Sequence, residues 1–380
     1  MTDKEAAAIA MRPHPTHDER SRQDFDGVFR TYLRQRLMPG IKPLYDNRVL
    51  PAFKQEHGRE PESKSEVTKA MTSTNYYQTW SYLQRISQQL LWDSVIDSVE
   101  RTLPELIERA QGLNKLGSLH MDPDLEIPRY HSSHDIHQMP GGYHTEFCEN
   151  DIAAGAIFDM GVPIYSGGVM GAANDVLGQT VASFYQANFP DSKPARILDL
   201  GCAIGNSTLP WKEAFPEAEV HGIDVGGPCV RYAHARANAM GYDVHFHQQN
   251  AESLNFEDNS FDLITSCILF HETSVPAIAK IMAECHRLLK PGGKMVHTDG
   301  SLTKDWEPYR AFSADWEVLN NNEPFLGTLR NFDLEGAVAD AGFDPSKITF
   351  TTAAAGKEPP ATRGYLAGFG SIPIYMAEKS

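Results

Sequence analysis

The feature that most constrains the fold is a regular alternation of two kinds of segment between residues 195 and 300. Five runs are short, apolar and rich in β-branched residues: 195–200, 218–225, 243–249, 261–270 and 293–300. Helical segments separate them, at residues 207–215, 229–240 and 275–289. Strands that alternate with helices predict an α/β fold with a parallel sheet covered on both faces. Two later runs, 347–353 and 371–379, bring the sheet to seven strands, and we expect the last strand to be antiparallel.

The chain before residue 195 has a different pattern. We expect a flexible tail over residues 1–22 and helices over residues 23–117. In residues 76–103, apolar side chains recur at three- and four-residue steps, which is typical of a helix that packs into a core or a dimer interface. Pro104 should break or restart that helix. Residues 118–170 are rich in His, Pro, Gly and Tyr and are predicted to be irregular, and a helix follows over residues 172–188.

Charge and cysteine content exclude several classes of partner and site. The formal charge of −16 disfavours nucleic acid and anionic membrane surfaces. The sequence contains no run of 18 apolar residues, which predicts no membrane span. The N-terminus lacks the apolar core of a secretory signal. Five scattered cysteines without C-x-x-C spacing argue against a disulfide framework and fit a reducing cytoplasm.

A glycine-containing turn follows the first strand of the alternating region. In ILDLGCAIGNST, residues 197–208, the strand ends at Asp199, and Gly201 and Gly205 bracket a turn into a helix. Such a turn lies at the carboxyl edge of a doubly wound sheet, where ligands bind, and glycine permits positive φ there. The G-x-x-x-G spacing leaves the pyrophosphate cradle of G-x-G-x-x-G incomplete. The carboxylate before the turn suits a cationic ligand, although a nicotinamide-dependent oxidoreductase stays an alternative.

Three further motifs follow in order. The second strand ends at Asp224, the pair Asn250–Ala251 follows the third strand, and LLKPGGKMVHTDG covers residues 288–300. Together with the glycine turn, they resemble the class I S-adenosylmethionine-dependent methyltransferases over roughly residues 195–300. The most similar branch is the ubiquinone/menaquinone C-methylase-like one (methyltransferase type 11/25), which acts on small molecules. The resemblance implies a Rossmann-like, seven-stranded methyltransferase sheet, with S-adenosylmethionine as cofactor and S-adenosylhomocysteine as product.

The resemblance also implies which residues bind the cofactor. Asp224 would accept hydrogen bonds from the ribose hydroxyls, and Asn250 would offer its amide oxygen to adenine in place of the family's carboxylate. The full set of predicted cofactor-binding residues is Asp199, Gly201, Cys202, Ala203, Gly205, Asn206, Asp224, Val225, Asn250, Ala251, Cys267 and Tyr165.

The residues that bind the methyl acceptor are expected after the fourth strand, where the sequence has His271 and Glu272. His271 can serve as a base with a pKa near neutrality; the alternative is that it packs beside the cofactor while Glu272 caps the next helix. A base is needed only for a protonated nucleophile, so oxygen is the first choice of acceptor atom, with sulfur, nitrogen and carbon open. An insertion at about residues 303–330 offers substrate-binding candidates: Trp316, Asn320 and Asn321. The alternative for that insertion is a surface helix that ends in an Asn-rich turn.

The stretch HSSHDIHQMPGGYH, residues 131–144, carries four histidines around a Gly-Gly turn. Glycine hinges beside aromatic side chains suit a lid over the active site, with His137 contacting the acceptor and Tyr143 and His144 in catalytic roles. A metal at His131, His134 and His137 would need a helix that Pro128 and Pro140 shorten. No Cys or H-E-x-x-H motif accompanies these histidines, so we predict no metal site.

These inferences divide the chain into a tail (1–22), a helical N-terminal region with the lid (23–170) and a catalytic domain (171–380). We expect a cytoplasmic methyltransferase that acts on a small molecule, with the N-terminal helices as a candidate homodimer interface. A non-catalytic protein that binds S-adenosylmethionine is a further alternative.

Overall fold

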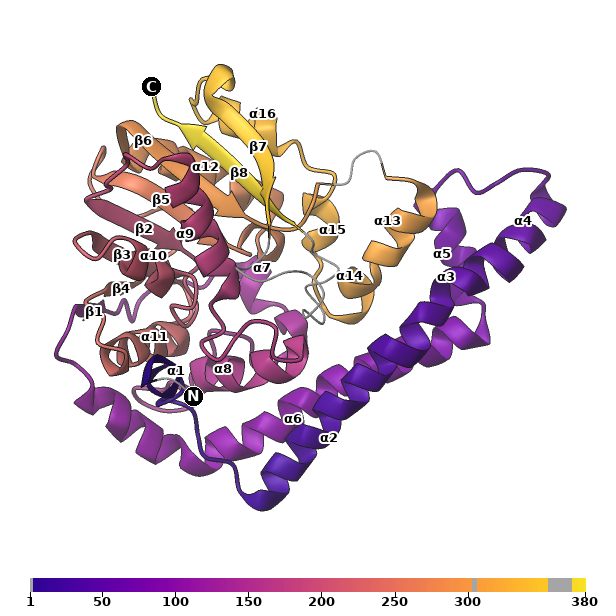
Figure 1. The fold of residues 1–380 in the computed structure, drawn as a ribbon, viewed down its shortest axis with the longest axis horizontal. Helices are drawn as coiled ribbons and strands as arrows, with labels where there is room; N and C mark the ends of the chain where they lie inside the picture. Colours follow the sequence, from indigo (N-terminus) through magenta and orange to yellow (C-terminus); the bar gives the residue numbers. More distant parts are fainter. Residues whose placement is uncertain (1–2, 303–305, 355–370) are drawn as a thin grey trace.

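A single eight-stranded sheet forms the centre of the protein (Figure 1). The computed structural model describes residues 3–302, 306–354 and 371–380. The strands run in the order β1-β4-β3-β2-β5-β6-β8-β7, and β8 is antiparallel to both of its neighbours. Their bounds are Ser118–His120 (β1), Arg196–Leu200 (β2), Glu219–Asp224 (β3), His245–Gln248 (β4), Phe261–Cys267 (β5), Leu289–Thr298 (β6), Ile348–Ala353 (β7) and Ile372–Glu378 (β8).

The predicted α/β fold is confirmed, and seven strands lie where the sequence predicts them. The eighth, β1, comes from the N-terminal region and pairs in parallel with β4 at the edge of the sheet. Three residues, Ser-Leu-His, carry no β-branched pattern, and this explains why the sequence does not reveal the strand.

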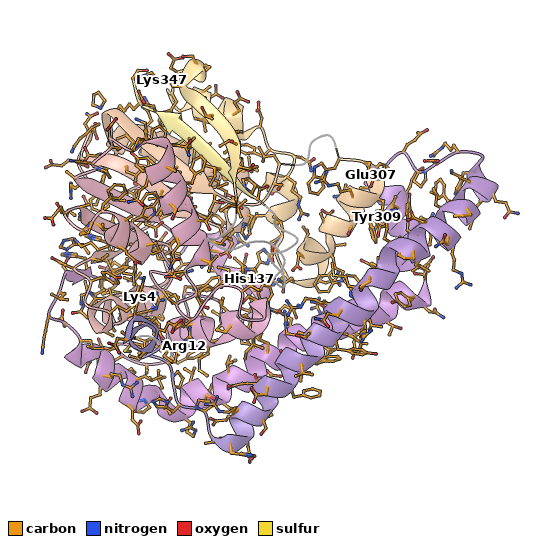
Figure 2. All side chains as sticks on the ribbon, viewed as in Figure 1. Lys4, Arg12, His137, Glu307, Tyr309 and Lys347 are labelled. Carbon is orange, nitrogen blue, oxygen red and sulfur yellow. The ribbon has the colours of Figure 1, made fainter. Side chains whose placement is uncertain are left out.

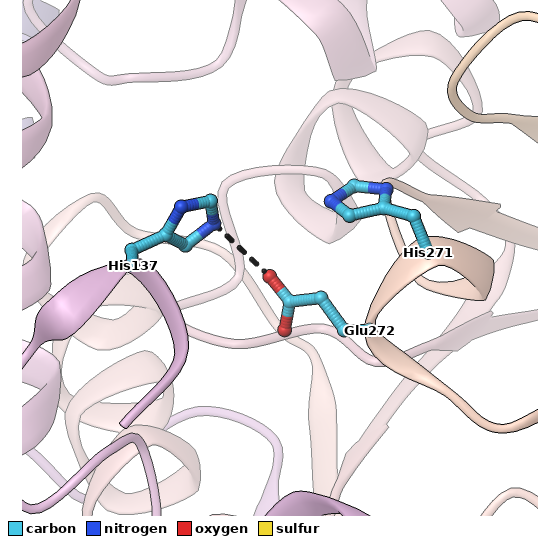
Figure 3. A group of neighbouring side chains, drawn as sticks. All are labelled: His137, His271 and Glu272. Atoms are coloured by element: carbon cyan, nitrogen blue, oxygen red, sulfur yellow. Dashed lines mark ion pairs between the residues drawn. The ribbon is translucent and has the colours of Figure 1, made fainter. Parts of the chain in front are cut away.

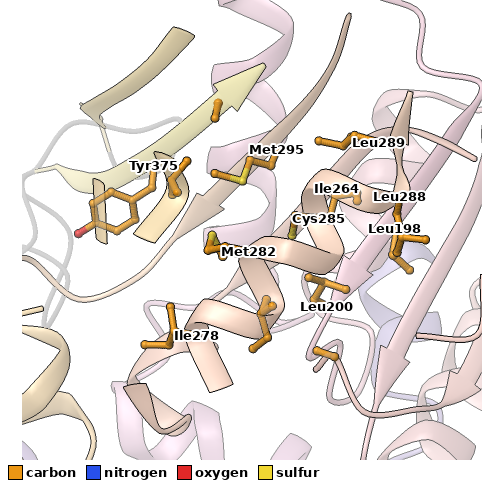
Figure 4. Packing of buried hydrophobic residues seen from close by; sticks show 14 of the residues in the cluster. Leu198, Leu200, Ile264, Ile278, Met282, Cys285, Leu288, Leu289, Met295 and Tyr375 are labelled. Carbon is orange, nitrogen blue, oxygen red and sulfur yellow. The ribbon is translucent and has the colours of Figure 1, made fainter. Parts of the chain in front are cut away.

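Helices cover both faces of the sheet because successive strand side chains point to opposite sides. Ile197 packs with α9 (Val176–Asn188), α10 (Thr208–Ala214) and α11 (Gly227–Ala239). Its neighbours Leu198 and Leu200 pack with α12 (Val275–Leu288) and α16 (Leu334–Asp340) on the other face (Figure 4).

The N-terminal helices form a long arm beside the sheet domain, made chiefly of α2 (His17–Tyr32) and α6 (Asn75–Gly112) (Figure 1). Shorter elements complete it: Leu33–Leu37, Met38–Gly40, α3 (Ile41–Leu44), Tyr45–Val49, α4 (Leu50–His57) and α5 (Lys64–Thr72). From the sheet domain, α13 (Pro308–Ala314) and α14 (Trp316–Asn320) reach back to the arm; α15 (Leu326–Leu329) follows them. Residues 303–305 of the predicted insertion lie outside the described residues.

Three expectations for the N-terminal half are corrected. Helix α6 runs through Pro104, because buried side chains on both sides of it, Val99 and Leu106, belong to one core cluster. Residues 1–22 contain α1 (Asp3–Ala8) and the start of α2 instead of a flexible tail. Met11 is fully buried there, and Arg12 Nη2 lies 2.9 Å from an oxygen of Asp159.

The third correction concerns residues 118–170, which hold two helices: α7 (Arg129–Ser132) and α8 (Ala153–Ser166). Glycines let α8 pack closely on its neighbours, since an added Cβ would lie 2.5 Å from Tyr232 at Gly155 and 2.4 Å from Trp92 at Gly161. Besides Met38–Gly40 in the arm, three further 3-10 turns lie in the described residues: Ile136–Gln138, Phe270–Glu272 and Pro345–Lys347.

Candidate active site

The turn after β2 has the backbone that its glycines predict. Gly201 and Gly205 adopt φ of 66° and 74°, and Ala203 between them adopts 42°. A Cβ on Gly201 would lie 2.8 Å from Leu269, so the turn also packs closely on the chain that follows β5. The carboxyl ends of β2, β3, β5 and β6 meet at this edge of the sheet.

Asp199 is fully buried at the end of β2. Its Oδ2 accepts hydrogen bonds from Ser207 Oγ at 2.7 Å and Thr208 Oγ1 at 2.6 Å, which tie the carboxylate to the start of α10. Oδ1 is buried and has no hydrogen-bond partner. Burial raises the pKa of Asp199 to about 7, although the two hydroxyls oppose that shift.

Asp224 ends β3, and the backbone holds both of its carboxylate oxygens. Oδ2 accepts from the Ala203 amide at 2.9 Å, and Oδ1 accepts from the Gly226 amide at 2.8 Å. Burial raises the pKa of this carboxyl to about 6, with a smaller contribution from the charge of Glu272. The carboxylate that ends β3 is therefore fixed against the glycine turn.

The other predicted cofactor residues make local contacts near the ends of the strands. Asn250 Oδ1 accepts from the Glu252 amide at 3.0 Å, and Ala251 is buried beside it. Asn206 Nδ2 donates to the Asn174 carbonyl at 3.3 Å, and the Val225 carbonyl accepts from Gln248 Nε2 at 3.1 Å. Of the two cysteines, Cys202 is fully buried and Cys267 is the last residue of β5.

His271 differs from the near-neutral base that the sequence suggests. Its Nδ1 lies 2.6 Å from Asp299 Oδ1, and Oδ2 of the same carboxylate accepts from the Phe270 amide at 2.6 Å. Burial alone would lower the pKa of His271, but Asp299, with help from Glu323 and Glu272, raises it to about 9. The imidazole is therefore oriented by a carboxylate, and it is cationic at neutral pH.

The segment 131–144, which the sequence predicts to be a lid, brings His137 close to Glu272 at this edge of the sheet (Figure 3). Its Nε2 lies 3.3 Å from Glu272 Oε1 and its Nδ1 lies 3.0 Å from Glu323 Oε1. His137 and Gln138 adopt φ of 55° and 58°, an uncommon conformation for residues other than glycine. The His137 carbonyl accepts from Gln88 Nε2 at 2.9 Å and from Trp92 Nε1 at 2.8 Å, so α6 holds the strained turn.

Tyr143 and His144 lie in the same lid. The Tyr143 carbonyl packs on the glycine turn after β3: a Cβ on Gly226 would lie 2.5 Å from that oxygen. Burial, with the charges of Glu272 and others, raises the pKa of Tyr143 well above its usual value and keeps the phenol neutral. Burial lowers the pKa of His144, whose Nδ1 is buried without a hydrogen-bond partner.

The predicted substrate-binding residues separate into two groups. Trp316 is buried against the arm, where its Nε1 donates to Ser81 Oγ at 2.9 Å, and Asn320 Oδ1 contacts the same hydroxyl at 3.3 Å. Asn320 and Asn321 both contact the 131–144 segment: the Asn320 carbonyl accepts from Gln138 Nε2, and Asn321 Nδ2 lies 3.1 Å from His137 Nδ1. Tyr165 of α8 lies close by, with its ring centre 6.1 Å from that of His137.

Sequence reasoning missed Asp299, Glu323, Gln88 and Trp92. Asp299 directly follows a predicted strand, so its place at the carboxyl edge was a usable signal. Glu323 sits in an Asn-rich turn, and Gln88 and Trp92 belong to a long amphipathic helix. Nothing in the local pattern separates those three residues from ordinary surface or core positions.

Comparison with known proteins gives a family match for part of the chain. Residues 197–293 match the family model described as a methyltransferase domain. The demethylmenaquinone methyltransferase of Thermus thermophilus is 38% identical over 140 residues, which cover 37% of this chain and 61% of that protein. The fatty-acid O-methyltransferase of Mycolicibacterium smegmatis is 27% identical over 190 residues, 48% of this chain and 65% of that protein. The chain thus spans less than two thirds of the length of these relatives.

Among solved structures, Haemonchus contortus phosphoethanolamine N-methyltransferase 2 in complex with S-adenosyl-L-methionine is similar to this chain. It has a TM-score of 0.41 and 20% identity, with 58% of this chain and 57% of that chain covered.

Proposed function

We propose that this chain, whose residues 197–293 match the family model of a methyltransferase domain, transfers a methyl group from S-adenosylmethionine to a small-molecule acceptor. The observation that carries the proposal is the convergence of three features at one sheet edge: the glycine turn, the half-buried Asp224 carboxylate and the Asp299–His271 pair. The relatives named for demethylmenaquinone and fatty-acid methylation support a small molecule over nucleic acid as the acceptor.

The residues at the edge fit this cofactor. Asp199 Oδ1 is a buried oxygen without a partner, which suits an ammonium donor. Asp224 is held by two backbone amides, and each oxygen keeps a lone pair for a ribose hydroxyl. Asn250 Oδ1 likewise keeps a lone pair for the adenine amino group while it accepts from Glu252.

When bound, S-adenosylmethionine supplies an electrophilic methyl group, and the chain's residues position the acceptor and exclude water. Tyr143 and the lid backbone cover the end of β3. His271 is oriented through Nδ1 by Asp299, and its cationic form can donate a hydrogen bond from Nε2 to an acceptor oxygen, whereas only its neutral form can take the proton of an acceptor hydroxyl. This pair supports oxygen as the acceptor atom, with sulfur, nitrogen and carbon as the alternatives to be tested.

Two measurements test the proposal. Calorimetry should give binding of S-adenosylmethionine and none of NAD, and a metabolite screen should identify an acceptor that drives S-adenosylhomocysteine release. Asp224→Asn should weaken cofactor binding about ten- to a hundredfold, the usual cost of losing a charge-assisted hydrogen bond. The exposed Asp243→Asn serves as control. Equal affinity of both variants would reject the site, and tight binding without any methylated acceptor would support a non-catalytic role.

We further propose a cytoplasmic homodimer that associates through the arm. Phe25, Val28 and Tyr32 of α2 are 61%, 70% and 54% exposed and recur at helical spacing, which suits burial against a second copy. The five cysteines are unpaired, which supports a reducing compartment. In the part of the chain that the structure describes, no helix has the length and apolarity to cross a membrane.

A further inference from the structure

Three side chains at the acceptor edge converge from two separate segments. His137 comes from the lid, and His271 and Glu272 come from the 3-10 turn after β5. Each offers one ligand atom, and the three atoms lie within 4.8 Å of one another. Figure 3 shows the two rings and the carboxylate directed toward a common space. We propose that His137, His271 and Glu272 bind one divalent first-row transition-metal ion, with Zn²⁺ as the reference ion.

Carboxylates occupy the opposite side of each ring. Asp299 lies 2.6 Å from Nδ1 of His271, and Glu323 lies 3.0 Å from Nδ1 of His137. Histidines that ligate metals characteristically donate their second ring nitrogen to a carboxylate, which fixes the tautomer and the ring plane. The same arrangement leaves Nε2 of both rings for an ion once each ring has lost its Nε2 proton, which the binding of an ion would release. A pair of histidines that only pack in a core would not each require a carboxylate partner such as Asp299 or Glu323.

The spacing also suits an ion. Ligand atoms about 2.0–2.2 Å from a tetrahedral ion lie roughly 3.3 Å from one another. His137 Nε2 and Glu272 Oε1 are already 3.3 Å apart. The His271 ligand atom lies within 4.8 Å of the other two, so its approach to the ion would close the third side and leave the remaining coordination position for water or an acceptor oxygen.

The local charge balance and the backbone support the same conclusion. Glu272, Glu323 and Asp299 surround two imidazoles, and Glu317 Oε2 is buried nearby without a hydrogen-bond partner. Buried carboxylates in excess are costly unless a cation offsets them.

The backbone at His137 supports the same conclusion. Its left-handed conformation is held by two hydrogen-bond donors from α6, and such strain persists at sites where a side chain must keep one orientation.

The ligand types select the class of ion. Two imidazoles and one carboxylate suit Zn²⁺, Fe²⁺, Mn²⁺ or Co²⁺, whereas Mg²⁺ and Ca²⁺ prefer oxygen ligands throughout. The set differs from the sequence alternative of His131, His134 and His137, because His134 lies against Phe325, with ring centres 6.1 Å apart.

The test uses the full chain and does not depend on methyl transfer. Elemental analysis of protein purified without chelators should find one transition-metal ion per chain. After chelator treatment, Zn²⁺ titrated in competition with a chromogenic chelator should bind at 1:1, and Co²⁺ should give visible bands typical of nitrogen and oxygen ligands. Absence of saturable 1:1 binding for both ions would overturn the proposal.

Variants assign the ligands. Glu272→Gln and His137→Gln should each weaken Zn²⁺ binding more than tenfold, and Asp299→Asn should weaken it ten- to a hundredfold through the His271 ring. His134→Gln, in the same lid, should change it less than twofold. Equal losses in His134→Gln and Glu272→Gln, or no loss in either ligand variant, would reject this ligand set. S-adenosylhomocysteine affinity and circular dichroism, measured alongside, show whether each variant keeps its fold and its cofactor site.

Discussion

Single residues at the sheet edge owe their orientation to neighbouring carboxylates and amides. Asp224 is held by two backbone N–H groups, and His271 is held by Asp299. The sequence predicts Asp224 and His271 because Asp224 is the last residue of a strand and His271 comes shortly after one. It does not predict the partners of His271, since a pKa near 9 depends on Asp299, Glu323 and Glu272, which other segments supply.

His271 should matter for turnover more than for cofactor binding. His271→Asn removes the imidazole that Asp299 orients, so kcat should fall about a hundredfold or more, the typical contribution of a positioned acid or base. The affinity for S-adenosylmethionine should change less than threefold. Steady-state kinetics with the identified acceptor, together with calorimetry, checks both values. A normal kcat would leave His271 as a packing residue.

Asp26 on α2 should make folding stability depend on pH. It is 1% exposed, neither carboxylate oxygen has a hydrogen-bond partner, and burial raises its pKa to about 6 against the opposing charges of Arg30 and Arg34. The folded state therefore binds the proton more tightly than the unfolded state. This contribution to stability is full below about pH 4 and is lost as the pH rises to about 6.

Asp26→Asn should consequently gain stability relative to the natural protein between pH 4 and pH 7, on the order of 2 kcal/mol. Urea unfolding at several pH values measures the difference. Asp24→Asn, an exposed neighbour on the same helix, should show no such trend. A pH-independent difference for Asp26→Asn would contradict the assignment.

Among the elements, strands were predictable and the N-terminal segments were not. Strands β2 to β8 are predictable from their apolar, β-branched runs. Strand β1 and helix α1 instead depend on tertiary contacts: β1 pairs with β4, and α1 packs on α11. Helix α6 continues through Pro104 for the same reason. Tertiary packing overrides the local helix or strand propensity of a segment when burial stabilises a different secondary structure.

The start of α2 offers a test at this scale. The Thr16 hydroxyl accepts from the Glu19 amide at 3.3 Å, and the Glu19 carboxylate accepts from the Thr16 amide at 2.8 Å, which completes a capping box. Thr16→Ala should lower the free energy of unfolding by about 1 kcal/mol. Thr31→Ala, on the exposed side of the same helix, is the control for denaturant unfolding. Equal effects would mean that the cap contributes nothing specific.

For the whole molecule, the proposed homodimer depends on the exposed apolar face of α2 in the arm. Val28→Glu would insert a charge into the exposed Phe25–Tyr32 stripe, so the proposed dimer should dissociate to the mass of one chain. Ser21→Glu adds the same charge to another exposed site on α2 and should leave the dimer intact. Light scattering on a size-exclusion column measures the mass of each variant in solution and shows which one is a dimer. A natural protein of single-chain mass would reject the dimer outright.

Helix α6 joins parts of the molecule that lie far apart. Trp80 packs on Trp316 of α14 with ring centres 5.5 Å apart, and twelve residues later Trp92 holds the carbonyl of His137, which Figure 2 labels between the sheet and the arm. Twelve helical residues span about 18 Å. The helix therefore connects the arm near α14 to the turn at His137 through one continuous element, so the packing of Trp80 on Trp316 and the position of His137 depend on the same helix.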